Sequence, residues 1–272
     1  MKHPFFISER PLVFAHRGGA ALAPENTLVA FDNGLALGAD GLELDVHLSR
    51  DGIVMVHHDH TLDRTTNLHG PINQFTASEL AGADAGWNFQ VGDTYPFRGR
   101  GIGVPTLAEV LGRYPDVRVI VELKTGEEEL AKAVVAVIRA ANAINRVCVG
   151  SFDVRGLRHV RTLEPALATS GARREVLWSL LSAWCRCSLH PASYCGFQVP
   201  ERSGRTRVVS RAWINAAHRA GLGVHVWTVD HPEDAVRLLE YGADALITDR
   251  PDLIVPVCRQ FGRRLAASDT IR

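Results

Sequence analysis

The chain of 272 residues carries 30 basic and 30 acidic side chains, and 46% of its residues are hydrophobic. This composition supports a large core and excludes global disorder, and the balanced charge provides no overall field that would attract nucleic acid or an anionic membrane. No apolar run approaches the length of a membrane span, and the N-terminal residues lack the long apolar segment of a signal peptide. We therefore expect a cytoplasmic protein with no nucleic-acid partner, no integral membrane segment and five free cysteine thiols. Its oligomeric state is left open.

Short apolar runs that end in polar residues alternate with segments of helical apolar spacing. The predicted barrel strands span residues 12–15, 41–47, 117–124, 147–151, 166–170, 195–199, 224–229 and 245–248. The predicted helices that follow them span residues 28–37, 107–114, 127–141, 153–163, 173–186, 210–220, 232–241 and 251–264. Eight strand–helix units in a chain of this length predict an α/β fold of the (β/α)8 TIM-barrel type. A doubly wound sheet is less consistent, because Gly18-Gly19 lacks the spacing of a dinucleotide-binding turn.

The segment after the second strand departs from this alternation. The Asp51-Gly52 turn predicts that residues 53–57 return as a hairpin, and residues from about 61 to 104 show weak periodicity. We expect a single barrel domain over residues 1–272, with a small inserted subdomain at about 61–104 that contains a short helix at 77–80. The aromatic residues of the insertion are expected to form its small core rather than an exposed rim. They are Trp87, Phe89, Tyr95 and Phe97.

Carboxylates gather where the predicted strands end, which is where a TIM barrel places its active site. Glu43 and Asp45 alternate with apolar residues in the second strand and so point to one face, and Glu122 lies near the end of the next barrel strand. A solvated strand face would explain the first two alone. Burial of several carboxylates, however, favours a hard divalent cation that relieves their desolvation and repulsion. We predict one Mg or Ca ion at Glu43, Asp45 and Glu122.

Basic and imidazole side chains accompany these carboxylates. Arg17 and Lys124 follow two of the strands and suit an anionic substrate, most simply a phosphate ester. His16 and His58 lie at the same end and suit acid–base catalysis near neutral pH. The neighbouring His57 should point to the opposite face.

Four nearby residues admit two interpretations each. Asp59 either positions His58 or caps a turn, and Asp249 is expected to cap the helix before Pro251 rather than to support the site. Glu25 either belongs to the site or begins the first helix, where it or Asn26 would be the N-cap. Trp227 either lines the site or fills the barrel mouth.

Taken in order, these motifs resemble the glycerophosphodiester phosphodiesterase family over residues 12 to about 256. The motifs are His16-Arg17-Gly18, Pro24-Glu25-Asn26-Thr27, Glu43-x-Asp45, His58-Asp59 followed by Leu62-x-Arg64-Thr65-Thr66, Glu122-x-Lys124, Trp227-Thr228-Val229 and Thr248-Asp249. The resemblance implies a TIM barrel with an insertion, and hydrolysis of glycerophosphodiesters to an alcohol and sn-glycerol 3-phosphate with a divalent cation.

The resemblance also implies a role for each residue of the site. Glu43, Asp45 and Glu122 would be the metal ligands, and His16 and His58 the general acid–base pair. Arg17 and Lys124 would bind phosphate, Glu25 would organise or contact the site, and Trp227 would line the glycerol end. The segment from 177 to 195 shows no chemical motif, which leaves the alcohol specificity open.

Two alternatives to this function differ in what they require. A lysophospholipase D-like enzyme, or another phospholipase of the same barrel superfamily, would need an exposed apolar rim at the barrel mouth to reach lipid. A barrel that binds phosphate esters without hydrolysing them would be expected to lack a metal ligand or a histidine, whereas the complete set is present here.

Overall fold

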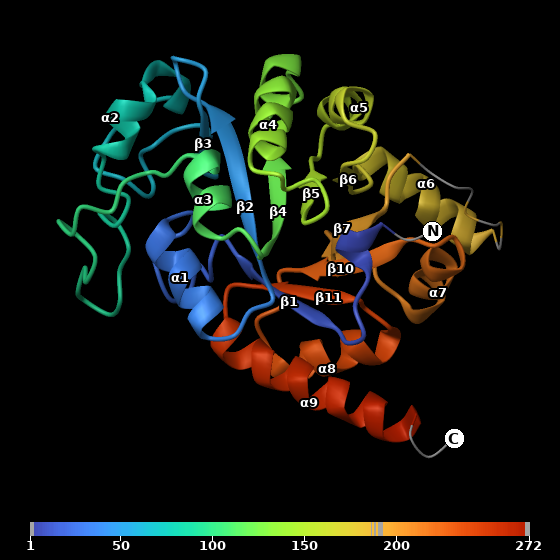
Figure 1. Cartoon of the computed structure of the whole chain (residues 1–272). Coiled ribbons are helices and arrows are strands. Elements are labelled where there is room, and N and C mark those ends of the chain that lie inside the picture. Colours follow the sequence, from blue (N-terminus) through green and yellow to red (C-terminus); the bar gives the residue numbers. More distant parts are fainter. Residues whose placement is uncertain (1–2, 186, 188, 190–192, 270–272) are drawn as a thin grey trace.

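The computed structural model describes residues 3–185, 187, 189 and 193–269, and in this part of the chain it shows the predicted barrel (Figure 1). The parallel strands are β1 (Leu12–His16), β2 (Gly41–Leu48), β4 (Arg118–Leu123), β5 (Val147–Gly150), β6 (Ala168–Thr169), β7 (Gly196–Pro200), β10 (Gly223–Trp227) and β11 (Ala245–Thr248). They follow the order β6-β5-β4-β2-β1-β11-β10-β7. The two end strands meet at a bridge between Ser170 and Gly196, so the barrel is nearly closed.

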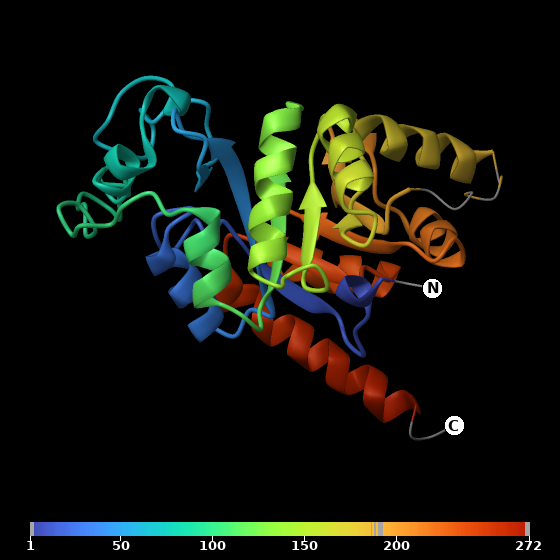
Figure 2. The same cartoon turned by 45° about the horizontal axis from the view of Figure 1, so that its top comes forward.

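Helices surround the strands, as both views show (Figures 1 and 2). They are α1 (Leu28–Ala36), α3 (Leu107–Arg113), α4 (Glu128–Ala140), α5 (Val154–Leu163), α6 (Arg173–Trp184), α7 (Arg211–Arg219), α8 (Pro232–Tyr241) and α9 (Pro251–Asp269). The predicted end, at Arg186, of the helix over residues 173–186 lies outside the described residues. No described helix has the length and apolar character needed to cross a membrane.

The N-cap of α1 differs from the prediction. Thr27, not Asn26 or Glu25, adopts the extended backbone of a cap, and its hydroxyl accepts a hydrogen bond from the Ala30 amide. Asn26 cannot fill this position because its backbone is left-handed, with φ of 58°. Its side chain instead reaches the second strand.

The N-terminal end of the barrel is filled by aromatic side chains. A short 3-10 helix, η1 (Pro4–Phe6), places Phe5 and Phe6 against Phe14 and His225, and the ring centroids of Phe6 and His225 lie 4.8 Å apart. Sequence periodicity did not predict this plug, because three residues are too few to show a period. These rings cover the end of the barrel opposite to the carboxyl ends of its strands.

The insertion after the second strand packs on a core of its own. β3 (Val54–Val56) pairs antiparallel with β2, and η2 (Ile72–Gln74) and α2 (Ala77–Ala81) follow it. This core is mainly aliphatic and includes Met55, Leu62, Ile72, Leu80, Ala83, Ala85, Ile102 and Val104. The aromatic prediction holds only in part. Phe97 packs against the core, but Trp87 and Tyr95 are exposed and contact the guanidinium of Arg98 instead.

A second small hairpin lies between β7 and α7. It consists of β8 (Arg202–Ser203) and β9 (Thr206–Arg207), which pair antiparallel. The residues of this hairpin are exposed, and Arg202, Ser203 and Thr206 border the barrel mouth.

Candidate active site

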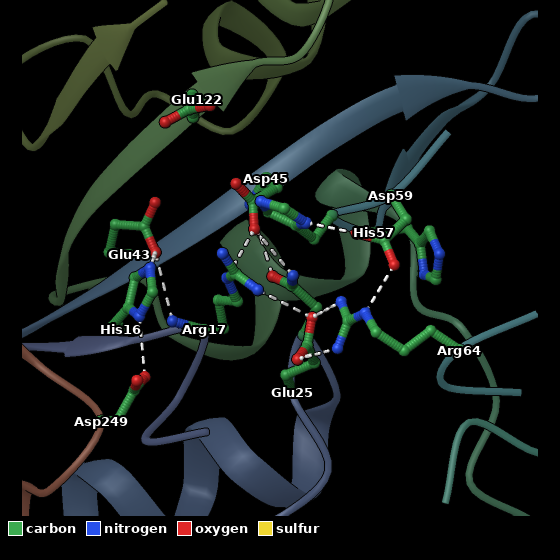
Figure 3. Close-up of polar contacts among 12 residues, drawn as sticks. His16, Arg17, Glu25, Glu43, Asp45, His57, Asp59, Arg64, Glu122 and Asp249 are labelled. Atoms are coloured by element: carbon green, nitrogen blue, oxygen red, sulfur yellow. Dashed lines mark hydrogen bonds and ion pairs between the residues drawn. The ribbon is translucent and has the colours of Figure 1, made fainter. Parts of the chain in front are cut away.

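Strand register brings together carboxylates that lie far apart in the sequence. His16 of β1 pairs with Glu43 of β2, and Asp45 of β2 pairs with Glu122 of β4. Carboxylate oxygens of Glu43, Asp45 and Glu122 lie within 4.8 Å of one another. Figure 3 shows Glu43 and Asp45 two residues apart on β2, with Glu122 on the adjacent strand β4.

Two cations lie against this carboxylate cluster. Lys124 Nζ is 3.2 Å from Asp45 Oδ1 and donates a hydrogen bond of 2.8 Å to Glu122 Oε1. Arg17 Nε lies 3.3 Å from Asp45 Oδ2. Burial alone would raise the pKa of Asp45, but the charges of Lys124 and Arg17 hold it below its ordinary value.

At Glu43, nearby positive charge does not offset the effects of burial and of the Asp45 charge on the pKa. It is 5% exposed, and burial together with the charge of Asp45 raises its pKa to about 8. The backbone N–H of Arg17 donates a hydrogen bond of 3.2 Å to Glu43 Oε2. A buried carboxylate that is costly to ionise beside two others is the donor set that a hard divalent cation stabilises. The residues present therefore fit a Mg or Ca ion.

His16 is held between two carboxylates (Figure 3). Its Nδ1 lies 2.7 Å from Asp249 Oδ1, and its Nε2 lies 3.8 Å from Glu43 Oε2. Burial alone would lower the pKa of His16, but Glu43 and Asp249 raise it to about 9. Asp249 is held in turn by Asp230, because Asp230 Oδ1 accepts a 2.8 Å hydrogen bond from the backbone N–H of Asp249. The side chain of Asp249 thus supports the imidazole, whereas we expected a helix cap.

His58 has a similar carboxylate partner. Its Nδ1 lies 2.6 Å from Asp59 Oδ1, and Arg64 Nε donates a 2.6 Å hydrogen bond to Asp59 Oδ2. Asp59 therefore positions His58. The neighbouring His57 is buried away from the barrel mouth with its Nε2 3.2 Å from the Thr61 carbonyl oxygen, so only His58 of the two lines the cavity.

Glu25 lies behind the site and joins two of its loops. Its carboxylate accepts hydrogen bonds of 2.7 and 2.8 Å from Arg64 and one of 3.0 Å from Arg17. Glu25 does not line the cavity, and these contacts link it to two arginines beside the site. Asn26 was missed as a site residue. Its Nδ2 donates a 2.9 Å hydrogen bond to Asp45 Oδ2, and only the Pro-Glu-Asn-Thr motif could have pointed to it.

The site opens into a cavity of about 780 Å³ at the carboxyl ends of the strands. The predicted residues on its polar side are His16, Arg17, Glu43, Asp45, His58, Glu122 and Lys124. Trp227 and Phe152 also line the cavity, and their rings meet edge to face at 6.0 Å. Side chains of α6 and the β8–β9 hairpin complete the lining.

Comparisons with known proteins agree with this arrangement. The model of the glycerophosphoryl diester phosphodiesterase family matches residues 16–253. A glycerophosphodiester phosphodiesterase of Caldanaerobacter subterraneus subsp. tengcongensis is 35% identical over 93% of this chain and 100% of its own length.

Solved structures share the fold. The crystal structure of a glycerophosphoryl diester phosphodiesterase domain from Mycobacterium tuberculosis has a TM-score of 0.80 and 25% identity, and the match covers 92% of this chain and 99% of that one. A phosphodiesterase of Oleispira antarctica in complex with the product sn-glycerol-3-phosphate has a TM-score of 0.71 and 28% identity, over 91% of this chain and 96% of that one. Together these matches establish that the chain belongs to the glycerophosphoryl diester phosphodiesterase family.

Proposed function

We propose that this chain hydrolyses glycerophosphodiesters to an alcohol and sn-glycerol 3-phosphate with the help of one divalent cation. The observation that supports this most is the pair of imidazoles beside one carboxylate cluster, each held through Nδ1 by an aspartate. The family membership supports the substrate class, and the product bound to the relative from Oleispira antarctica supports the product.

Glu43, Asp45 and Glu122 would hold the cation. When bound, it would neutralise negative charge on the non-bridging phosphate oxygens. The three carboxylates suit Mg and Ca equally, since both prefer oxygen ligands.

The remaining residues would bind the phosphate and move protons. Lys124 and Arg17 supply positive charge beside the cluster, and Lys124 Nζ is already within hydrogen-bond distance of two of its carboxylates. An aspartate at Nδ1 of His16 and of His58 leaves Nε2 of each ring as the atom that can exchange a proton with the substrate. One ring would accept the proton of the attacking oxygen and the other would protonate the leaving alcohol.

A lysophospholipase D-like activity is the second candidate. Val176, Leu177 and Leu180 of α6 give the cavity an apolar wall on the side away from the histidines, and such a wall could contact an acyl chain. The aromatic residues of the insertion do not support this candidate, because they lie outside the cavity lining.

The test is the release of sn-glycerol 3-phosphate from glycerophosphocholine and glycerophosphoethanolamine, beside the release of choline from lysophosphatidylcholine, each measured with Mg, with Ca and with EDTA. Cation-dependent cleavage of the soluble diesters is the expected result and would identify the ion. Cleavage of the lysolipid alone would favour the second candidate. Absence of cleavage with all three substrates would contradict an enzymatic role.

A further inference from the structure

Helix α6 exposes an apolar face at the barrel mouth. Exposed fractions are 52% for Leu177, 70% for Trp178, 48% for Leu181 and 85% for Trp184. The spacing of these four residues places them on one side of the helix, and we refer to them as the α6 apolar face. Two highly exposed tryptophans on one helix are unusual for a surface that meets only water.

The other side of α6 fixes its orientation. On that side, the residues that pack against a hydrophobic core cluster of the barrel are Val176, Leu180 and Ala183. In addition, Ser179 Oγ accepts a 3.1 Å hydrogen bond from Trp213 Nε1. The helix is therefore anchored by one face while the α6 apolar face points outward. In both views α6 lies at the edge of the molecule, on the side opposite α2 of the insertion (Figures 1 and 2).

Arginines lie at the N-terminal end of this face and beside it. Arg173 and Arg174 begin α6, and Arg202, Arg205 and Arg207 lie on the neighbouring β8–β9 hairpin, all of them exposed. Among the residues that the structure describes, Arg207 is the only one of these five arginines that forms an ion pair. Its partner is Glu201, at 3.7 Å. Arg173 and Arg202 also line the same cavity as Leu177. The chain has no net charge, so this concentration of positive charge is local.

We propose that the α6 apolar face and its surrounding arginines dock on an anionic lipid surface. Tryptophan and leucine on one helix face favour the boundary between headgroups and acyl chains, and arginine favours anionic headgroup phosphates. A second copy of the chain fits less well. A symmetric contact would set the arginines of one copy against those of the other, because both partners would use the same patch.

Docking of this kind would bring lipid to the cavity. Leu177 is exposed and at the same time lines the cavity wall, so the α6 apolar face continues directly into the site. The inference goes beyond the proposed reaction and does not depend on it, because it concerns where the protein binds rather than which bond it cleaves.

The test is sedimentation with lipid vesicles. Vesicles of phosphatidylcholine with about 40% phosphatidylglycerol are compared with vesicles of phosphatidylcholine alone, at low and raised salt. The intact chain should bind the anionic vesicles, and salt should weaken this binding. The double variant Trp178→Ser/Trp184→Ser should bind them about tenfold or more weakly, because two large apolar side chains leave the interface.

Matched variants separate docking from folding. Trp87→Ser replaces a third exposed tryptophan, 38% exposed and located on the insertion, and should bind vesicles like the intact chain. Arg174→Gln/Arg205→Gln should lose the preference for anionic vesicles without loss of apolar contact. Neither Trp178 nor Trp184 lines the cavity, so the double variant should keep the far-UV circular dichroism spectrum and the rate on soluble glycerophosphocholine.

Three results would overturn the proposal. The first is no binding of the intact chain to anionic vesicles, and the second is equal binding by the double variant. The third is a dimer of the intact chain in size-exclusion chromatography that the double variant converts to a monomer, which would assign the face to a second copy.

Discussion

Asp249 offers a sharp test of how the site holds His16. The two side chains meet at 2.7 Å, and Asp249→Asn keeps the shape of the side chain but removes its charge. An amide can present either its oxygen or its NH2 group to Nδ1, so the variant no longer fixes which ring nitrogen carries the proton.

The size of the effect follows from the strength of this contact. A hydrogen bond to a charged group contributes about 1.5–3 kcal/mol, which corresponds to about 1–2 pKa units. His16 has a pKa raised to about 9 from the ordinary 6.5, with burial acting against this rise and Glu43 and Asp249 producing it. Loss of the Asp249 charge should therefore lower the pKa of His16, and kcat should fall about 10- to 100-fold.

The assay is the pH dependence of kcat and KM for a soluble glycerophosphodiester. The limb of the profile that reports His16 should move to lower pH in Asp249→Asn, with KM changed much less than kcat. Asp252→Asn, three positions along the chain, is the matched control, because Asp252 pairs with Arg250 outside the cavity. An unchanged kcat and an unchanged profile in Asp249→Asn would refute this role of Asp249.

Three further substitutions test other parts of the structure. His58→Ala should lower kcat about 100-fold or more with little change in substrate affinity, as expected for an acid–base group, and steady-state kinetics measures both. Gly18→Ala should destabilise the fold by about 2–4 kcal/mol in urea unfolding, because the backbone φ is 90° and a Cβ would lie 2.6 Å from the Ala30 carbonyl carbon. Burial alone would raise the pKa of Glu25, but Arg64 and Arg17 hold it below the ordinary 4.5, so its charge stabilises the fold at neutral pH. Glu25→Gln should lose about 1–3 kcal/mol there, and the difference from the intact chain should shrink as pH falls through 4.5 and below.

Each of these expectations has a contrary result. A collapse of substrate affinity with an intact rate would make His58 a binding residue. Gly52→Ala is the control for Gly18, since its φ is 77° but no atom lies within 4 Å of the added Cβ, and equal losses would exclude the steric argument. A stability difference for Glu25→Gln that does not change with pH would show that the ion pairs at this position contribute little.

The sequence predicted the barrel and the members of its carboxylate cluster well, for a physical reason. Apolar runs and helical spacing are set by burial, which acts on every strand and helix, and polar residues at strand ends mark the open end of a barrel. Glu43, Asp45 and Glu122 were found in this way, and the structure brings their oxygens together. Their role as ligands, the single-domain organisation and the cytoplasmic location stay predictions.

Side-chain direction was harder to predict. An aspartate before Pro251 is compatible with a helix cap, and only the fold shows that Asp249 meets His16 from the other end of the chain. Leu177, Leu181 and Trp184 of α6 have the i, i+4, i+7 spacing of a buried face, and only the packing shows which side of the helix is covered. Thr27 became the cap because Asn26 is left-handed and reaches Asp45. Such choices depend on tertiary contacts that local patterns do not encode.

The most direct measurement is the binding of Mg or Ca to the chain by equilibrium dialysis after treatment with EDTA, paired with sn-glycerol 3-phosphate release in the same samples. We predict one ion per chain and a rate that rises in proportion to its occupancy. In Glu43→Gln, a buried ligand is neutralised without a change of shape, so both the bound ion and the rate should be lost while the circular dichroism spectrum is kept. Full hydrolysis by the intact chain without any bound ion, or by Glu43→Gln at the rate of the intact chain, would contradict the metal-assisted reaction.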